Sequence, residues 1–159
     1  MISVRSFGFS LRVAAIAVVV VFFCGCAKEE SAEKFDPARD AAGDVAKAVA
    51  LAKAQDKRVI VDVGGEWCSW CHLLDNFIAS NDDVKSLVDS RYVWVKVNYS
   101  KENKNEAFLS RWPKVAGYPH LFVLDADGKL LHSQDTGELE GGKSYDKAKF
   151  VAFVQRWAS

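Results

Sequence analysis

The sequence lacks several features on which common classes of protein depend. Lys plus Arg and Asp plus Glu both number 21 in 159 residues, so no basic field favours a nucleic-acid partner. No glycine-rich phosphate-binding loop is present, and no arrangement of Ser, His and Asp indicates a hydrolase. Internal repeats and low-complexity segments are also absent. What remains is a chain long enough for one globular domain, with half of its residues apolar.

Long hydrophobic runs are scarce as well. Residues 13–23, VAAIAVVVVFF, form an apolar run of 11, after a lead that contains Arg5 and Arg12 but no acid. This run is too short for an ordinary membrane-spanning helix and suits the core of a signal peptide, with an uncleaved anchor as the alternative. The following residues 23–26, FCGC, resemble the bacterial lipobox, in which cleavage precedes a cysteine that becomes acylated. We therefore expect a signal peptide over residues 1–26 and a lipid on Cys26.

Cysteine is rare, and its few positions carry information. Cleavage would remove Cys24 and commit Cys26 to lipid, which leaves Cys68 and Cys71 as the thiols of the mature chain. An exported domain with one close cysteine pair has no framework of disulfides to staple it. The pair is therefore expected to be chemical rather than structural. We expect the protein on the periplasmic side of a bacterial membrane, held there by lipid rather than by charge.

The remaining chain predicts an α/β fold. Residues 27–42 are polar and small and predict a tether, followed by a domain over residues 43–159. Helices alternate with strands and the chain ends in a hairpin and a helix, which indicates a central mixed sheet flanked by helices, with an N-terminal helix before the first core strand. The predicted helices are 44–57 with Asp44 as candidate N-cap, 71–80, 81–90, 102–112 and 144–158, and the predicted strands are 58–65, 91–100 and a hairpin over 118–134.

The segment GGEWCSWCH, residues 64–72, holds Cys68, Cys71 and His72. The same CxxCH motif occurs in redox dithiols, in c-type haem attachment sites and in parts of zinc sites. Here a strand would deliver Cys68 to the first turn of a helix, where free amides and the helix dipole stabilise a thiolate. Cys71, one turn later, would be close enough to resolve a mixed disulfide. Trp67 would shield one side of the pair and offer an apolar surface to a partner.

The segment VDVGGEWCSWC resembles the strand and active site of the thioredoxin family, and the resemblance extends over roughly residues 40–158. It implies a thioredoxin-like fold. It also implies that Asp62 is a buried acid that assists proton transfer to the resolving cysteine, with Lys96 near it. In GYPHLFVLDADGK, it implies that Pro119 is a cis-proline opposite the active site, with Tyr118 before it.

A finer resemblance is to exported members of the superfamily with a WCxxCH motif and a long helix before the first core strand. Ser69 and Trp70 stand between the cysteines where thioredoxin has Gly-Pro, so the reducing strength does not follow from the family name. His120 stands where thioredoxins usually have Thr, and Gly64-Gly65 replace an aromatic residue and Ala.

Rival interpretations of the motif remain open at this point. A haem protein needs a second axial ligand, and with Met1 as the only methionine the candidates are His120 and His132. A structural zinc site needs about four ligands, more than Cys68, Cys71, His72 and one distant histidine supply. A redox-inactive binding module of the same fold is a third possibility. Asp62 argues against it, because a buried carboxylate costs free energy unless it is paired, for instance with Lys96, or used.

Several residues near the motif have two interpretations each. His72 is expected to be a partly exposed first-turn residue rather than a catalyst. Trp70 belongs either to a docking surface or to a buried staple, and Tyr118 either packs or contacts substrate. Five further aromatic residues are expected in the core or at its edge: Trp94, Phe108, Trp112, Phe122 and Trp157.

These observations predict a thiol–disulfide oxidoreductase of the cell envelope. Cys68 is the expected nucleophile, Cys71 the resolving thiol, and Asp62 with Lys96 the proton shuttle. Trp67, Trp70, Tyr118 and Pro119 are the expected substrate contacts, where the backbone could pair with an extended peptide. The expected substrates are disulfide-containing proteins. No organic cofactor or metal is needed, but a reductase outside the cytosol would need a membrane-embedded electron donor.

Overall fold

The computed structural model describes residues 34–158. The predicted signal peptide, Cys26 and residues 27–33 of the predicted tether lie outside this range. Within residues 34–158, no helix is both long enough and apolar enough to cross a membrane.

The core of the molecule is a four-stranded mixed sheet in the order β2-β1-β3-β4. The strands are β1 (Arg58–Gly64), β2 (Tyr92–Asn98), β3 (His120–Leu124) and β4 (Leu130–Asp135). β1 pairs in parallel with β2 and antiparallel with β3, which in turn pairs antiparallel with β4. β1 is thus the central strand predicted from its continuous β-branched sequence, and six of its seven residues are buried.

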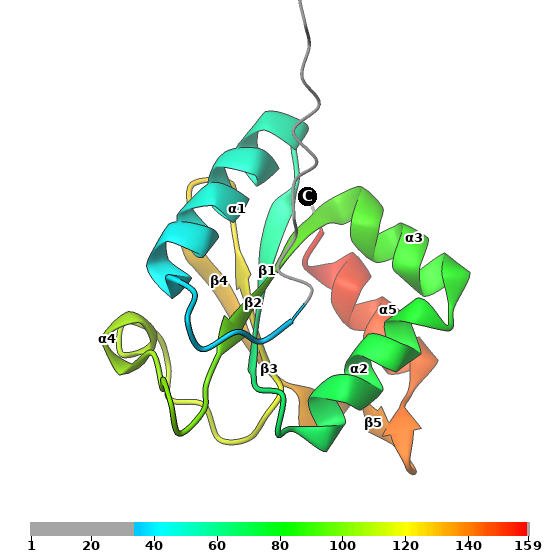
Figure 1. Cartoon of the computed structure of the whole chain (residues 1–159). Coiled ribbons are helices and arrows are strands. Elements are labelled where there is room, and N and C mark those ends of the chain that lie inside the picture. The colour runs from blue at the N-terminus through cyan, green and yellow to red at the C-terminus, as the bar shows by residue number, and fades with distance from the viewer. Residues whose placement is uncertain (1–33, 159) are drawn as a thin grey trace, which may run out of the picture.

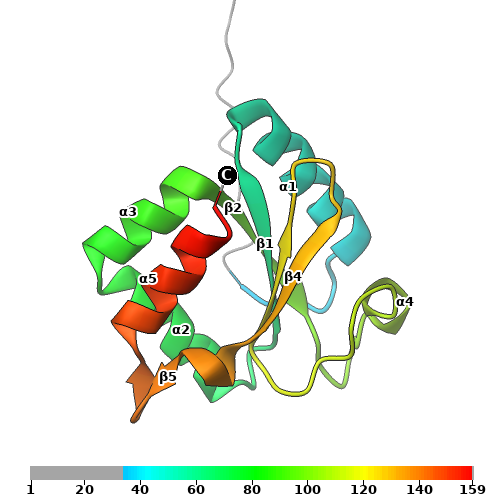
Figure 2. The same cartoon turned by 180° about the vertical axis from the view of Figure 1, so that it is seen from behind.

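Helices cover both faces of this sheet (Figure 1). α1 (Ala41–Gln55) packs on the face that carries the side chains of Val59, Val61 and Val63. The opposite face is covered by three helices, α2 (Ser69–Ala79), α3 (Asp82–Arg91) and α5 (Lys147–Arg156). Figure 2 shows the whole molecule from behind, with these three helices on one side of the sheet and α1 on the other. The predicted mixed sheet flanked by helices, with a helix before the first core strand, is confirmed.

Several element boundaries differ from the prediction. α1 begins at Ala41 because Asp40 is its N-cap and accepts a hydrogen bond from the Ala42 amide at 3.1 Å. Asp44, the expected cap, lies in the first turn and pairs with Arg39 at 2.6 Å. Residues before position 43, the predicted start of the domain, therefore also pack into it. One of them is Phe35, which lies in the predicted tether and is only 2% exposed.

Two segments have a different secondary structure from the one expected. The predicted helix over 102–112 is a single short turn, α4 (Glu106–Leu109). The predicted helix over 144–158 starts only at Lys147, where Asp146 caps it. Before it come a 3-10 turn, η1 (Thr136–Leu139), and a small hairpin of β5 (Glu140–Gly141) and β6 (Ser144–Tyr145). This hairpin is too short for a periodic pattern, and it packs against α2 beside the cysteine motif.

Candidate active site

The cysteine pair lies where β1 ends and α2 begins. Cys68 is the N-cap of α2, and its Sγ accepts a hydrogen bond from the Cys71 amide at 3.1 Å. This is the predicted position, where free amides and the helix dipole stabilise negative charge on sulfur. Cys68 and Cys71 form a disulfide with their Cα atoms 5.2 Å apart. Only 4% of Cys68 and 1% of Cys71 is exposed, so both sulfurs are almost completely buried in the disulfide form.

The inner sulfur is enclosed by the backbone of β1 and by Phe35. A Cβ atom added at Gly64 would lie 2.5 Å from Cys71 Sγ and 2.9 Å from Phe35 Cζ, both far inside van der Waals contact. Phe35, Cys68 and Cys71 form one buried cluster, against which Trp70 and Tyr118 pack. A side chain at Gly64, where thioredoxins have an aromatic residue, would thus clash with Cys71 and with the ring of Phe35, which comes from a different part of the chain.

Asp62 lies on the face of β1 that contacts Cys71. Residues two apart in a strand share a face, so the Asp62 side chain is on the same face as Gly64, whose Cα lies against the Cys71 sulfur. Asp62 is 1% exposed, and its Oδ2 accepts a hydrogen bond from Trp94 Nε1 at 3.3 Å. Its Oδ1 has no hydrogen-bond partner among residues 34–158.

Burial controls the protonation of this carboxyl group. Loss of solvent raises the pKa of Asp62 to about 7, although the charge of Lys96 and the Trp94 hydrogen bond act to lower it. The charge of Asp75 raises it further. A carboxyl group with a pKa near neutrality both accepts and releases a proton at physiological pH.

Lys96 is the neighbour of Asp62 in the parallel pairing of β1 and β2, as the resemblance implied. Its ion pair, however, is with another acid. Lys96 Nζ donates to Asp75 Oδ1 at 2.7 Å and to Oδ2 at 2.5 Å, and it lies 4.4 Å from the centre of the Phe35 ring. Within the described chain, Asp62 therefore feels Lys96 as a nearby charge and not as a direct ion-pair partner.

On the outer side of the pair, three aromatic rings form a continuous surface. Trp67 is 59% exposed, donates from Nε1 to the Tyr99 carbonyl at 2.7 Å, and meets Tyr118 edge-on at 5.6 Å. Tyr118 stacks on Tyr99 with ring centres 4.7 Å apart. The Tyr118–Pro119 peptide bond is cis, as the resemblance implied, and the Pro119 carbonyl accepts from Thr136 Oγ1 at 2.6 Å.

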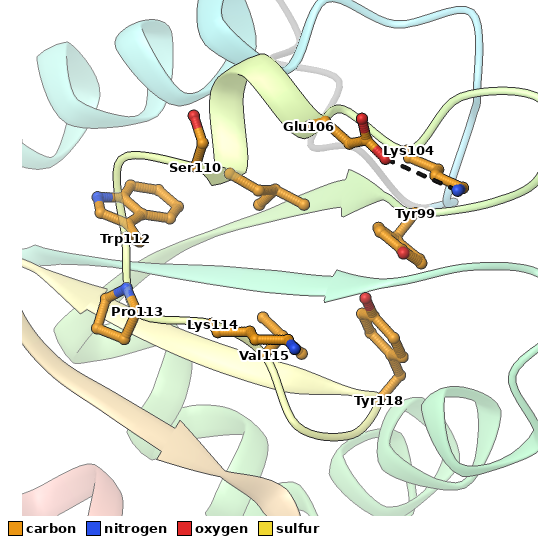
Figure 3. Close-up of a pocket in the computed structure, with 10 residues that line it drawn as sticks. Tyr99, Lys104, Glu106, Ser110, Trp112, Pro113, Lys114, Val115 and Tyr118 are labelled. Atoms are coloured by element: carbon orange, nitrogen blue, oxygen red, sulfur yellow. Dashed lines mark ion pairs between the residues drawn. The ribbon is translucent and has the colours of Figure 1, made fainter.

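Two shallow pockets extend from this aromatic surface. One, of about 500 Å³, is lined by Trp67, Tyr99, Lys104 and neighbouring residues of the loop after β2. The other, of about 360 Å³, shares Tyr99 and Lys104 with it. Figure 3 shows the second pocket with Tyr99 and Tyr118 at one end and Trp112 at the other. Together they make a groove that leads away from the cysteines along the loop of α4.

Trp70 lies apart from this groove. Its ring packs edge-on against Tyr145 at 5.7 Å, and its carbonyl accepts a hydrogen bond from the Tyr145 hydroxyl at 3.3 Å. Tyr145 belongs to β6 of the small hairpin. The structure thus places Trp67, Tyr118 and Pro119 together and Trp70 in a staple between α2 and that hairpin.

The two histidines closest to the motif differ in burial. The His72 side chain is 47% exposed, and its Nε2 contacts the Glu66 carbonyl at 2.9 Å. His120 is buried beside Phe122, and its Nε2 shares a hydrogen bond with Ser133 Oγ at 2.8 Å. Burial lowers the pKa of His120, which favours the neutral form of its ring.

The five aromatic residues expected in the core or at its edge lie there. Phe108 and Phe122 are buried, and Trp94, Trp112 and Trp157 are partly buried against the two core clusters.

Three residues of the site have no counterpart in the sequence prediction. Phe35 is the sole aromatic residue between positions 27 and 59, which is the one signal that marks it. Asp75 follows Cys71 by four residues, the spacing that places two side chains on one face of a helix. Tyr99 has no comparable signal, because its role depends on the loop that brings Tyr118 to it.

The rival chemistries fit this geometry poorly. Among residues 34–158, no three His, Cys, Asp or Glu side chains gather closely enough to hold a metal ion. Attachment of haem would require both sulfurs to be open to a large macrocycle, whereas Phe35 and Gly64 enclose Cys71. The pair is instead arranged to form and break a bond between its own sulfurs.

Comparison with known proteins agrees with this geometry. The chain is 29% identical over 90 residues to the disulfide bond reductase DsbH of Chlamydia pneumoniae, covering 52% of this chain and 53% of that protein. It is 31% identical over 108 residues to the thiol:disulfide interchange protein DsbD of Pseudomonas fluorescens, covering 67% of this chain and 17% of DsbD. The chain thus spans about half the length of the first relative and a small part of the second.

A solved structure and a family model extend the comparison. The disulphide isomerase from Xylella fastidiosa Temecula1 superposes with a TM-score of 0.66 at 25% identity, over 77% of this chain and 94% of that one. The model of the family described as thioredoxin-like matches residues 40–126, more than half of the chain. The resemblance inferred from the cysteine motif, Asp62 and Pro119 is confirmed, and the chain belongs to the thioredoxin-like family.

Proposed function

We propose that this protein is a thiol–disulfide oxidoreductase that exchanges its Cys68–Cys71 disulfide with disulfides of other proteins. The observation that carries the proposal is the placement of Cys68 as the N-cap of α2, with the Cys71 amide aimed at its sulfur. This environment lowers the cost of a thiolate, which is the attacking species in disulfide exchange. Two relatives, a disulfide bond reductase and a thiol:disulfide interchange protein, have names that describe the same chemistry.

In the reducing direction, the Cys68 thiolate attacks one sulfur of a substrate disulfide. The substrate S–S bond breaks, a mixed disulfide forms, and the first substrate thiolate leaves and takes up a proton. The Cys71 thiol then loses its proton to Asp62 and attacks Cys68 Sγ. The second substrate thiolate leaves, so the substrate gains two electrons and the enzyme becomes the disulfide that the structure contains. The same steps in reverse oxidise a dithiol.

Asp62 is proposed as the proton acceptor because its carboxyl group is buried on the face of β1 that meets Cys71. Its raised pKa of about 7 suits a group that takes a proton from a thiol and later releases it. Lys96, held by Asp75, contributes a positive charge that keeps the ionised form of Asp62 accessible.

Substrates are proposed to dock on the outer aromatic surface formed by Trp67, Tyr99 and Tyr118. This surface borders both pockets, and exposed aromatic side chains are enriched at protein contacts. The Tyr118 backbone beside Pro119 is proposed to pair with an extended segment of the substrate. Trp70 packs on Tyr145 and on the cluster of Phe35 and the two cysteines, and it lines neither of these pockets.

The cellular setting is proposed from the sequence and the relatives. Export by a signal peptide over residues 1–26 and a lipid on Cys26 would place the domain at an envelope membrane. A reductase in that compartment needs a membrane-embedded donor that supplies two electrons per turnover. The relative from Pseudomonas fluorescens is a thiol:disulfide interchange protein, so dithiol exchange is the proposed route for these electrons.

A redox titration tests the proposed function. The protein is equilibrated in glutathione buffers of graded ratio, and the state of the pair is followed by Trp67 and Trp70 fluorescence and by thiol alkylation. A single reversible two-electron transition is expected. A midpoint near −270 mV, roughly that of thioredoxin, would indicate a reductase, and one near about −120 mV an oxidant. Absence of a reversible transition would overturn the proposal and favour a redox-inactive binding module.

A further inference from the structure

The segment that precedes α1 reaches into the redox site, although its composition is that of a linker. In Figure 1 this segment crosses in front of β1 and β2 before α1 begins. It is held at two points. The Phe35 amide donates to Glu66 Oε1 at 2.9 Å, and the Pro37 carbonyl accepts from Asn103 Nδ2 at 2.9 Å. Both contacts join it to loops that follow the strands carrying Asp62 and Lys96.

Phe35 is the residue that this segment contributes to the site. It is 2% exposed and belongs to the same buried cluster as Cys68 and Cys71. The clash that a Cβ atom at Gly64 would make with both Phe35 Cζ and Cys71 Sγ shows that ring and sulfur lie against the same point of β1. Its ring also faces the ammonium group of Lys96 at 4.4 Å.

We propose that Phe35 is a positioning residue of the redox centre, whose ring closes the inner side of the cysteine pair so that Cys71 is reachable only through Cys68. The inference rests on the proposed role of Cys71 as the resolving thiol. A resolving thiol that met external disulfides directly would form mixed disulfides of its own, in competition with attack by Cys68. The aromatic ring prevents this by occupying the path to the Cys71 sulfur.

The same ring fixes the charges around Asp62. Lys96 Nζ lies between the Asp75 carboxylate and the face of Phe35, and both attract a cation. Phe35 therefore helps to hold Lys96 on Asp75, while Asp62 stays dry between β1 and α2. One side chain from outside the sheet thus shields the inner sulfur and orders the charges that accompany its proton transfer.

The accessibility of Cys71 tests this role directly, without a substrate. In the full chain with Cys68→Ser, the rate at which iodoacetamide modifies Cys71 is followed by site-resolved mass spectrometry. Adding Phe35→Ala is expected to raise this rate by about tenfold, because a cavity opens beside the thiol. Phe35→Leu, which refills most of the space, is expected to stay within about twofold of the parent.

Two further variants separate shielding from general stability. Phe153→Ala removes a buried ring from α5, 5% exposed against 2% for Phe35, and it is expected to leave the Cys71 rate unchanged. Glu66→Ala releases the Phe35 amide from an exposed side chain without a core cavity, and a rise of about threefold in the rate is expected. The inference is overturned if Phe35→Ala and Glu66→Ala leave the rate unchanged, or if Phe153→Ala raises it equally.

The outcome is independent of the titration that tests the proposed function. A reversible two-electron transition with no effect of Phe35 would reject the shield and keep the oxidoreductase. Slow modification of Cys71 that depends on Phe35, without any reversible redox transition, would reject the proposed oxidoreductase function and keep the proposed role of Phe35.

Discussion

The two sides of the cysteine pair differ in residue type and in exposure to solvent. The outer side, formed by Trp67, Tyr99 and Tyr118, is aromatic, partly exposed and bordered by two pockets. The inner side is closed by Phe35 and Gly64 and contains a buried carboxyl group. An outer surface of this kind suits variable protein partners, whereas a dry inner side suits a proton transfer that must be repeated identically in every turnover. Under the proposed function, recognition and proton transfer would take place on opposite sides of two adjacent sulfurs.

The sharpest way to break this comparison is to remove one sulfur at a time. Cys71→Ser is expected to accumulate mixed disulfides with client proteins through Cys68, because attack proceeds while resolution fails. Turnover is expected to fall by about a thousandfold or more, as for the loss of other covalent catalytic groups. Cys68→Ser should trap nothing, since the remaining thiol is enclosed. Non-reducing gels followed by mass spectrometry measure both, and adducts through Cys71 would reverse the assignment.

Asp62→Asn changes the inner side, and it is expected to lower activity but to raise stability above neutral pH. Turnover at pH 7 is expected to fall by about tenfold to a hundredfold, because the proton acceptor is lost. Folding, in contrast, raises the pKa of Asp62 from 3.8 to about 7, so wild type loses stability as pH rises through this window. The variant should avoid a cost of up to about 4 kcal/mol above pH 7.

Urea unfolding at pH 5 and pH 8 measures the stability part of this prediction. Wild type and Asp62→Asn should differ little at pH 5 compared with pH 8, where the variant should be the more stable protein. An equal difference at both pH values would mean that the ionisation of Asp62 is not coupled to folding.

Gly64→Ala tests how tightly the inner side is packed. The added methyl group would lie 2.5 Å from Cys71 Sγ and 2.9 Å from Phe35 Cζ, so both neighbours would have to shift. A loss of about 2 kcal/mol of unfolding free energy is expected for overpacking of this kind. Gly117→Ala is the matched control, because no atom lies within 4 Å of its added Cβ. Equal losses for the two variants in urea unfolding would contradict a close-packed inner side.

Features of the site that depend on short segments of the chain can be predicted from the sequence, whereas most contacts of the inner side cannot. The β-branched run of β1 identifies a central strand, and the resemblance to the thioredoxin family implies the burial of Asp62 within it. The position of Cys68 follows from the cysteine motif, and that of Pro119 from the resemblance of GYPHLFVLDADGK to the thioredoxin family. All of these signals are contained in a few consecutive residues, so they are visible without a structure.

The remaining contacts of the inner side depend on segments distant in the sequence. Lys96 is adjacent to Asp62 as predicted, but its choice of Asp75 depends on the orientation of α2. Phe35 stands alone in a polar segment, so no periodic pattern indicates its burial. Trp70 finds Tyr145 only because a hairpin of two-residue strands forms 75 positions later.

The smallest expected effect comes from the outer side, where Trp67→Ala and Trp70→Ala form a matched pair. Trp67 is 59% exposed, so its loss should change the unfolding free energy by less than about 0.5 kcal/mol. It should raise KM for a peptide disulfide by about fivefold, because an aromatic contact surface is removed. Trp70→Ala should instead cost about 2 kcal/mol of stability, since its ring packs on Tyr145. Steady-state kinetics and urea unfolding distinguish the two, and a rise in KM for Trp70→Ala alone would move the docking surface to the other side of the pair.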